Sequence, residues 1–246
     1  MMNFNKKIAD FDFNLLVGNS VEDTKTTVNR RMGWNFVVDN FFSINNTAET
    51  DRSITQANSR KRLVGVYGEF RIGYKSLAYV TVTGRNDWTS TLPVDNRSYF
   101  YPSVGGAFVF SELLLENNIL SFGKVRASWA RVGKDADPYV TNTYLDPPFI
   151  TIGGNGLQNS WTHGNTLLIP ETTESTEIGL EMRFLNGRIG FDWTYYTNKS
   201  YNQLLSPRTS QATGYIFMTT NAGDIVNKGM ESVSYTHLTL PTILRV

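Results

Sequence analysis

The stretch SYFYPSVGGAFVF (98–110), followed by LSFGKVRASWARVG (120–133), decides the fold. Residues in both segments alternate in character, which is the period of two of a β-strand and not the period of 3.6 of a helix. The second segment alternates apolar with polar residues, namely Val125, Ala127 and Trp129 with Lys124, Arg126 and Ser128. We therefore predict two long strands with one apolar and one polar face. Such an apolar face meets a core in a water-soluble protein, or lipid in an outer-membrane barrel with a wet lumen.

Composition narrows the class of protein. The chain has Cys 0, which leaves neither a disulfide framework nor a thiolate metal site. A net charge of +1 gives no electrostatic ground for a nucleic-acid partner. Charged residues make up 18%, which is below the roughly 25% of ordinary soluble domains and suits a surface that partly meets lipid. No apolar run approaches the roughly 18 residues of a membrane helix.

Residues that could support catalysis are scarce. His163 and His237 are the only histidines, so a histidine-based metal site or a Ser-His-Asp triad has almost nothing to work with. Asp135, Asp137 and Asp146 lack the ligand spacing of a calcium loop, and an aspartate before proline favours turns. The sequence therefore predicts no enzyme, no metal site and no cofactor.

The rest of the chain alternates in the same way. Further strands are predicted at 10–20, 62–74, 77–85, 176–184 and 188–198. Tight reversals at Lys75-Ser76 and Asn186-Gly187 contrast with long polar connections, which are predicted at 21–60, 86–97 and 133–173. Short turns at one rim and long loops at the other are typical of transmembrane barrels. The predicted fold is an all-β antiparallel meander.

Two sets of side chains are candidates for contact with a ligand or partner. Charged residues of the polar strand faces are expected to line the lumen of a barrel or to form a solvated sheet face: Glu69, Arg71, Arg126, Arg131, Glu177, Glu181 and Arg183. Aromatic residues in the predicted loops could stack on sugar rings or pack against neighbouring loops: Trp34, Phe36, Tyr144 and Trp161. Neither pattern decides between its two interpretations.

Four segments carry a family resemblance. Residues 84–113 (GRNDWTSTLPVDNRSYFYPSVGGAFVFSEL), 120–139, 169–205 and 212–231 resemble the later strands of SusC/RagA-type TonB-dependent outer-membrane transporters, and the resemblance covers most of 4–231. It implies a 22-stranded transmembrane barrel with an N-terminal plug, of which this chain is an incomplete C-terminal part. It also implies the lipid of a Gram-negative outer membrane, a SusD-like lipoprotein partner, energy from the TonB complex through the missing N-terminal part, and import of oligosaccharides or peptides.

The two ends of the chain depart from this pattern. Residues 1–231 are expected to form the partial barrel, whereas Ser232–Val246 (SVSYTHLTLPTILRV) has no counterpart in the family and is expected to be a non-native tail. The start, MMNFNKKIADFDFN, lacks the apolar core and cleavage site of a signal peptide, so either the outer-membrane interpretation is wrong or the chain is a fragment that lacks its true start.

An alternative from a different class is a soluble β-sheet carbohydrate-binding or adhesin-like module. That alternative predicts two sheets packed over the apolar rows, whereas a barrel wall leaves those rows on the outside of a single curved sheet. A β-rich hydrolase would need convergent carboxylates in a cleft, and no spacing in the chain indicates them.

Overall fold

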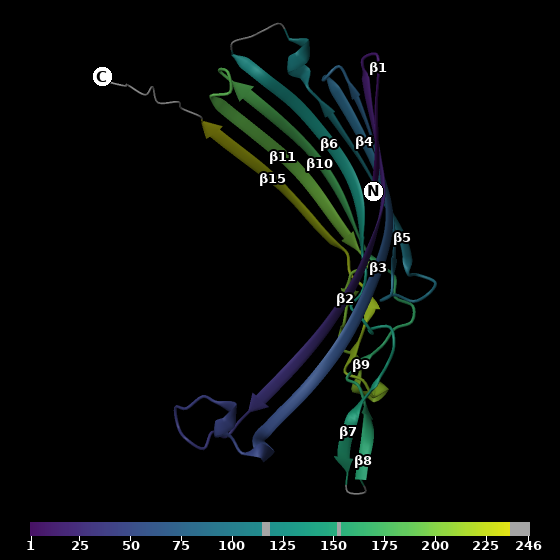
Figure 1. The fold of residues 1–246 in the computed structure, drawn as a ribbon, viewed down its shortest axis with the longest axis vertical. Helices are drawn as coiled ribbons and strands as arrows, with labels where there is room; N and C mark the ends of the chain where they lie inside the picture. Colours follow the sequence, from purple (N-terminus) through teal and green to yellow (C-terminus); the bar gives the residue numbers. More distant parts are fainter. Residues whose placement is uncertain (115–118, 152–153, 237–246) are drawn as a thin grey trace, which may run out of the picture.

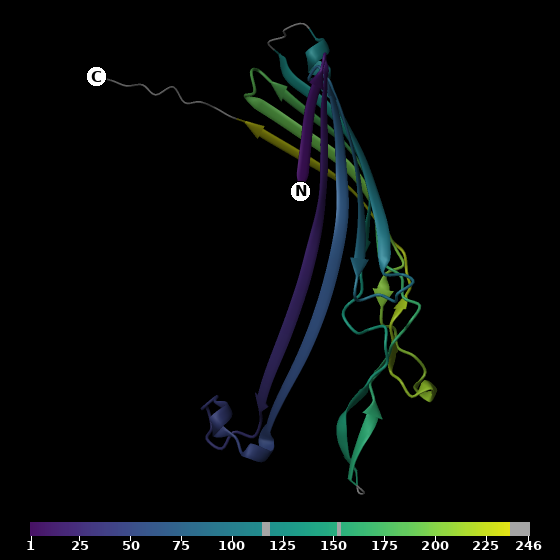
Figure 2. The ribbon, with the colours of Figure 1, turned by 45° about the vertical axis from the view of Figure 1, so that its right-hand side comes forward.

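A computed structural model describes residues 1–114, 119–151 and 154–236, and it consists of one large sheet with extended loops (Figure 1). Nine strands pair antiparallel in the order β1-β2-β3-β4-β5-β6-β10-β11-β15. Their bounds are β1 (Met2–Ile8), β2 (Phe11–Gly33), β3 (Arg52–Tyr74), β4 (Ala78–Thr89), β5 (Ser98–Phe108), β6 (Leu120–Lys134), β10 (Glu171–Phe184), β11 (Ile189–Tyr201) and β15 (Ile225–Thr236). The predicted all-β meander is confirmed. The sheet is open, with edges at β1 and β15, and curves like part of a barrel wall (Figure 2).

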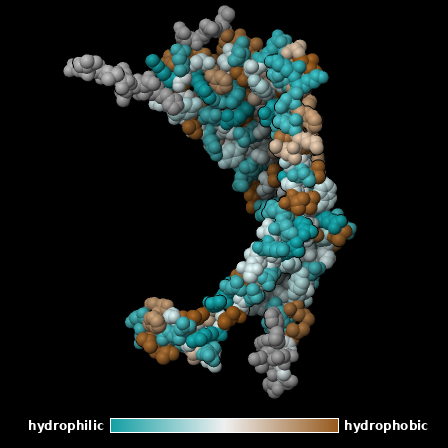
Figure 3. Space-filling model, in the orientation of Figure 1, coloured by the Kyte–Doolittle hydropathy of each residue, from teal (hydrophilic) through white to brown (hydrophobic). Residues whose placement is uncertain are grey.

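One face of the sheet is apolar and uncovered. Its residues come from alternate positions of successive strands and are each at least 40% exposed: Phe70, Val80, Val104, Val125, Ile178 and Tyr195. Hydrophilic residues gather on the concave side of the sheet (Figure 3). The described part of the chain buries few apolar side chains, of which Leu168 alone is completely enclosed. The packed double sheet that a soluble module requires is therefore not what these strands form.

The connections differ at the two ends of the sheet. Tight turns with left-handed backbone join the strands at one end, at Ala9, at Lys75 and Ser76, and at Leu185, Asn186 and Gly187. The turn between β5 and β6 begins with the 3-10 helix η3 (Phe110–Leu113). The opposite end carries the connections 34–51, 90–97, 135–170 and 202–224. This confirms the predicted contrast between short turns and long loops.

The predicted loop at 21–60 is wrong over most of its length. β2 continues to Gly33 and β3 begins at Arg52, and the two strands pair without interruption from Phe11↔Tyr74 to Gly33↔Arg52. Near the tip of this hairpin, over 22–33 and 52–62, apolar and polar residues no longer alternate because polar residues occupy both faces. The hydrogen-bonded ladder nevertheless continues. β1 was not predicted, and its pairing with β2 extends the sheet by one strand.

The part of the β2–β3 hairpin nearest its tip projects beyond its neighbours. We call it the upper part, although Figure 1 draws the tip at the lower left. β3 has 23 residues but the adjacent β4 has 12, and their pairing ends at Leu63↔Thr89. Residues 52–62 therefore extend roughly 35 Å past the end of β4, at about 3.3 Å per residue. The 3-10 helices η1 (Ile44–Asn46) and η2 (Glu49–Asp51) close the tip.

The long loops contain small sheets of their own. β7 (Leu145–Thr151) and β8 (Gly154–Asn159) form a hairpin. β9 (Thr162–His163) pairs parallel with β13 (Phe217–Met218), and β12 (Leu204–Leu205) pairs with β14 (Thr220–Asn221). The described part of 133–173 is thus more regular than predicted: β7 and β8 pair locally, whereas β9 pairs with β13, which lies far away in sequence.

Among the described residues, no helix is long and apolar enough to span a membrane.

Candidate functional site

The polar face of the sheet carries two charged networks, and the first lies toward the long loops. Arg85 and Asp87 alternate on β4, and Arg85 Nε donates to Asp87 Oδ1 at 2.8 Å. Arg85 Nη2 also donates to Ser20 Oγ on β2 at 3.1 Å, and the Tyr101 hydroxyl on β5 donates to Asp87 Oδ2. Asp87 is 3% exposed, yet it has both partners that a buried carboxylate needs. The network fixes the arginine across four strands.

The second network joins β6, β10 and β11. Arg126 donates in a bidentate arrangement to Asp192, with Nη1–Oδ2 of 3.0 Å and Nη2–Oδ1 of 2.9 Å, and it also donates to Thr194 Oγ1 at 2.6 Å. Asp192 lies two strands from Arg126, and the guanidinium crosses Gly179 on β10 to reach it. A Cβ at position 179 would lie 2.5 Å from Arg126 Nε, so the contact requires glycine there.

A smaller ionic cluster lies beside this network. Lys124 Nζ contacts Glu181 Oε2 at 2.6 Å, and Arg183 Nη2 contacts Glu181 Oε1 at 2.8 Å. Positive and negative groups therefore interleave on this wall, as predicted for Arg126, Glu181 and Arg183. Such a surface offers both hydrogen-bond donors and acceptors to a polar solute.

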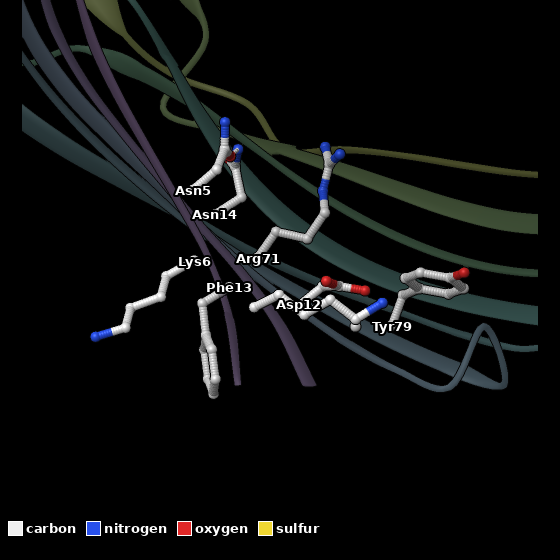
Figure 4. A pocket seen from close by; sticks show the side chains of 9 residues that line it. Asn5, Lys6, Asp12, Phe13, Asn14, Arg71 and Tyr79 are labelled. Atoms are coloured by element: carbon white, nitrogen blue, oxygen red, sulfur yellow. Dashed lines mark hydrogen bonds between the residues drawn. The ribbon is translucent and has the colours of Figure 1, made fainter. Parts of the chain in front are cut away.

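A hollow of ≈ 360 Å³ lies near the short turns, between β1 and β4. Figure 4 shows Asn5, Asn14 and Arg71 on one side of the strands, with Lys6 and Phe13 on the opposite side. Asn14 Nδ2 donates to Asn3 Oδ1 at 3.0 Å and also to Asn5 Oδ1. Arg71 Nη2 pairs with Glu69 Oε1 at 3.0 Å, which leaves other guanidinium donors directed at the open face.

Arg131 corrects the predicted set of lumen residues. Its position on β6 shares a face with Val125 and Trp129, and its guanidinium carbon lies 6.0 Å from the Trp129 ring centroid. It pairs with Glu174 of β10, whose position shares a face with Ile178. Arg131 therefore belongs to the apolar face, and counting alternate positions from Trp129 gives this result from sequence.

The loop from residue 135 is anchored to the rim by Asp135. Its carboxylate accepts hydrogen bonds from Thr89 and Thr91 at 2.6 and 3.1 Å, and it pairs with Lys61 Nζ at 2.6 Å. Beside it, the buried Leu92, Ala136 and Leu168 form a small core. Asp135 is thus committed to a structural contact.

The four predicted aromatic residues occupy two separate places. Trp34 and Phe36 lie at the β2–β3 tip, whereas Tyr144 and Trp161 lie in the 135–170 connection, away from that tip in both views (Figures 1 and 2). The structure does not bring them into one site. Trp161 is 65% exposed, and its carbonyl accepts from Ile216 N and Phe217 N at 2.9 and 3.0 Å.

The remaining three aromatic residues contact neighbouring rings or backbone. Phe36 packs edge-on against Phe42 with centroids 5.7 Å apart, and Tyr144 packs against Tyr139 at 6.4 Å. Trp34 N donates to Asp51 O at 3.1 Å. Trp161 thus presents the most exposed aromatic surface of the four.

Ion pairs lie at both ends of the apolar band, which is the row of exposed outward side chains that includes Phe70, Val80, Val104, Val125, Ile178 and Tyr195. Asp23 lies above the band, where the guanidinium groups of Arg60 and Arg62 lower the pKa of its carboxyl. In the short turns, Lys75 Nζ lies 3.0 Å from Asp10 Oδ2, and that carboxylate raises the pKa of Lys75.

Within residues 1–114, 119–151 and 154–236, no group of three or more His, Cys, Asp or Glu side chains could hold a metal ion. His163 packs edge-on against Tyr215, with ring centroids 4.8 Å apart, and its buried Nδ1 has no hydrogen-bond partner. His163 lies on β9, which pairs with β13 of the other long loop, and within the described ranges no carboxylate forms an ion pair with it.

A two-faced open sheet with an ionic inner wall and loops at one rim has the architecture of a segment of a β-barrel wall. Residues 3–243 match the family model described as "TonB dependent receptor-like, beta-barrel". The chain belongs to this TonB-dependent receptor family, whose β-barrels lie in the outer membrane. The predicted SusC/RagA-type resemblance is confirmed.

Two curated relatives place the chain within this family. It is 34% identical over 198 residues to the TonB-dependent receptor P26 of Formosa agariphila, covering 78% of this chain and 20% of that protein. It is 28% identical over 240 residues to the TonB-dependent receptor SusC of Bacteroides thetaiotaomicron, covering 92% and 23%. The chain thus spans about a fifth of the length of these relatives.

Solved structures show the same fold at low sequence identity. The RagAB peptide transporter aligns with a TM-score of 0.83 at 20% identity, over 97% of this chain and 27% of that one. The siderophore receptor PirA from Pseudomonas aeruginosa aligns with a TM-score of 0.58 at 20% identity, over 94% and 37%. The family identification removes the soluble adhesin-like alternative.

Proposed function

We propose that this chain is a wall segment of an outer-membrane importer of oligosaccharides or peptides that works with a SusD-like surface lipoprotein and draws energy from TonB. The observation that carries the proposal is the single curved sheet, with an uncovered apolar face and an ionic inner face. The apolar face suits lipid, and the ionic face suits a water-filled passage. No step of covalent chemistry is assigned to the segment.

The relatives support nutrient import. SusC and RagAB are similar to this chain, and RagAB is described as a peptide transporter. The cargo of this chain remains a choice between oligosaccharide and peptide, since the inner wall offers alternating donors and acceptors suited to both. The lipoprotein and TonB would act through the complete receptor.

The orientation is testable by thiol labelling, because this chain has no cysteine of its own and any cysteine elsewhere in the receptor can first be replaced by serine. Single cysteines would be introduced into the complete receptor in cells, at Ala127 on the apolar face and at Ser128 on the polar face. We expect a charged, water-soluble thiol reagent to label Ser128→Cys and an apolar maleimide to label Ala127→Cys. Equal labelling of both by the charged reagent would contradict the barrel-wall proposal.

Import is tested by growth. Cells lacking the receptor gene would be supplied with single oligosaccharides or peptides and complemented with the intact receptor. We expect one class of nutrient to require the receptor, a SusD-like lipoprotein and TonB. Growth that is independent of the receptor on every nutrient would argue against import, even with the labelling pattern confirmed.

Trp161 is our proposed loop contact for the cargo, because its ring is exposed while its backbone is anchored. Trp161→Ala is expected to raise the half-saturating cargo concentration roughly tenfold, in line with about 1–3 kcal/mol for stacking on an aromatic ring. Leu167→Ala is the control, since Leu167 is 79% exposed in the same connection. An equal effect in both variants would argue against stacking at Trp161.

We also propose that residues 232–246 are not native to the wall, as expected from the sequence. On β15, the outward row of Met230 continues with Ser232 and Ser234, opposite Trp193 and Phe191 of β11. Polar residues there would face lipid beside aromatic neighbours, which inverts the pattern of the other strands. The family match nevertheless extends to residue 243, so sequencing the genomic locus downstream of Glu231 is the test.

A further inference from the structure

Basic residues follow the apolar band on its outward face, at the end nearest the long loops. On β6, Arg131 is the next outward residue after Trp129, and on β15, Lys228 follows Met230. On β11, Lys199 lies two outward positions beyond Tyr195. Each strand thus passes from an apolar or aromatic side chain to a cation within a few residues.

Arg131 is fixed by two neighbouring side chains. Arg131 Nε donates to Glu174 Oε1 at 3.0 Å, while its guanidinium lies over the Trp129 ring. Glu174 is the register partner of Arg131 on one side and of Lys199 on the other. One carboxylate therefore stands between two cations. The Arg131 side chain remains 47% exposed, so its remaining donors are open to an external ligand.

Lys199 and Lys228 form no ion pair among the described residues, although Glu174 is the register partner of Lys199. Both are exposed, and no described carboxylate lies within ion-pair distance of either. Their strands are adjacent, with Thr197 opposite Lys228 and Lys199 opposite Val226. The cations consequently form a compact outward patch with Arg131, and we call these three residues the basic patch.

A second group lies at the same transition on β2 and β3. Arg60 and Arg62 follow Val64 on the outward row of β3, and Asp23 and Lys25 follow Val21 on β2. Asp23 pairs with both arginines, at 2.5 Å from Arg60 and 2.9 Å from Arg62, so the two arginines share one carboxylate. Excess positive charge on this outward row therefore recurs at a distance from the basic patch.

We propose that the basic patch binds the phosphate groups of an anionic lipid headgroup in the leaflet on the long-loop side of the membrane. Arginine and lysine donate to phosphate oxygens, and tryptophan prefers the level where headgroups meet hydrocarbon. The arrangement of Trp129 below Arg131 matches that order along the membrane normal. This inference rests on the outer-membrane location of the proposed function.

The test uses the complete receptor in micelles of an uncharged detergent, titrated with lipid A and followed by native mass spectrometry. The variant combines Arg131→Gln, Lys199→Gln and Lys228→Gln. We expect lipid A binding to weaken roughly 100-fold, since each basic residue near an anionic lipid surface contributes about 1 kcal/mol. Binding to the unaltered receptor should also weaken with added salt, because exposed charges are screened.

Two control variants separate charge from folding. Lys134→Gln removes an exposed lysine from the same rim but the opposite face, and it should leave lipid A binding unchanged. The charge-preserving set Arg131→Lys, Lys199→Arg and Lys228→Arg should retain binding within about threefold, since it keeps the net charge that attracts the anionic lipid. Unchanged binding in the Gln triple variant, or equal loss in Lys134→Gln, would overturn the proposal.

Inorganic phosphate distinguishes a lipid site from a phosphate site. We expect free phosphate at the same concentration not to displace lipid A, and displacement would overturn the lipid assignment. These readouts use purified receptor, whereas failure of the proposed function would appear as absence of the receptor from the outer-membrane fraction of cells. The two failures are therefore distinguishable.

Discussion

The two halves of the β2–β3 hairpin have the same backbone pairing, but they differ in how apolar and polar side chains are distributed over the two faces. In the lower half, from Phe11 to Val21, apolar residues alternate with polar ones, and in the upper half, from Glu22 to Gly33, polar residues occupy both faces. Alternation marks a strand whose faces meet different solvents. The upper half has water on both sides in the proposed barrel, so its ladder needs no apolar row. The comparison locates the membrane boundary near Asp23.

The largest loss of stability is expected from a charge placed within the apolar band. Val82→Arg puts a cation on the outward face between Phe70 and Val104, and it should destabilise the barrel by about 2–4 kcal/mol, as for charges near a bilayer midplane. Unfolding of the complete receptor in liposomes, followed by denaturant titration, measures the effect.

The matched variant lies in the upper half. Ile54→Arg replaces a residue on the outward row of β3 that is 75% exposed beyond the band, and the expected change is within about 0.5 kcal/mol. Equal destabilisation by the two substitutions would mean that the boundary near Asp23 does not exist.

The next largest effect is expected at the tip of the hairpin. Asn46 is 7% exposed, and its Nδ2 donates to Val38 O and Phe41 O at 2.7 Å each. Asn46→Ala leaves these acceptors unpaired, at a local cost of about 1–3 kcal/mol. Hydrogen exchange should therefore accelerate over 34–51.

Exchange in the lower half of the hairpin provides the internal control for Asn46→Ala. We expect protection of Phe11–Val21 to stay unchanged, because the hydrogen bonds of the Asn46 side chain go to Val38 and Phe41 of the tip. Asn45→Ala, at an exposed neighbouring position, should leave both regions protected as before. Loss of protection in the band would show that the two halves fold as one unit.

Gly179→Ala tests the inner face of the sheet at the level of the apolar band. The new methyl would displace Arg126 from Asp192, and about 1–2 kcal/mol is expected for this partly exposed pair. Gly105→Ala is the control, because its Cβ would meet Ser128 Cβ at an ordinary 3.7 Å. Equal shifts of the melting temperature in both variants would contradict the proposal that Arg126 reaches Asp192 because position 179 has no side chain.

The smallest effect is expected at Asp23. Because its folded pKa is lowered, its ion pairs stabilise the protein above the ordinary carboxyl pKa of 3.8, and this contribution is lost as pH falls through the folded value. Asp23→Asn should remove that acid dependence and change stability little at neutral pH, since the pair is exposed. Denaturant titrations at neutral and acidic pH compare the two proteins.

Sequence predicted the strands wherever the two faces differ. The apolar rows of β5, β6, β10 and β11 are visible at alternate positions, and Lys75-Ser76 and Asn186-Gly187 gave the hairpin turns. The same reasoning missed the upper β2–β3 hairpin because a strand with two wet faces has no periodic signal. β1 carries a weak one, with Met2, Phe4 and Ile8 at alternate positions interrupted by Lys6.

The candidate site was only partly predictable. The charges of Arg126, Glu181 and Arg183 on the polar face follow from their positions, but the reach of Arg126 across Gly179 depends on the register of three strands. Trp161 could be predicted as a loop residue, whereas its anchoring to Ile216 and Phe217 depends on a distant segment.

Sequence by itself determined the all-β class, the two-faced strands and the family, because alternation and short motifs are local properties of the chain. Tertiary structure alone decided the length of the hairpin that rises above the band, the joining of β9 to β13, and the pairing of Arg131 with Glu174 beside Trp129. These features depend on strand register and on backbone partners far apart in sequence, and a local pattern of side chains carries no record of either.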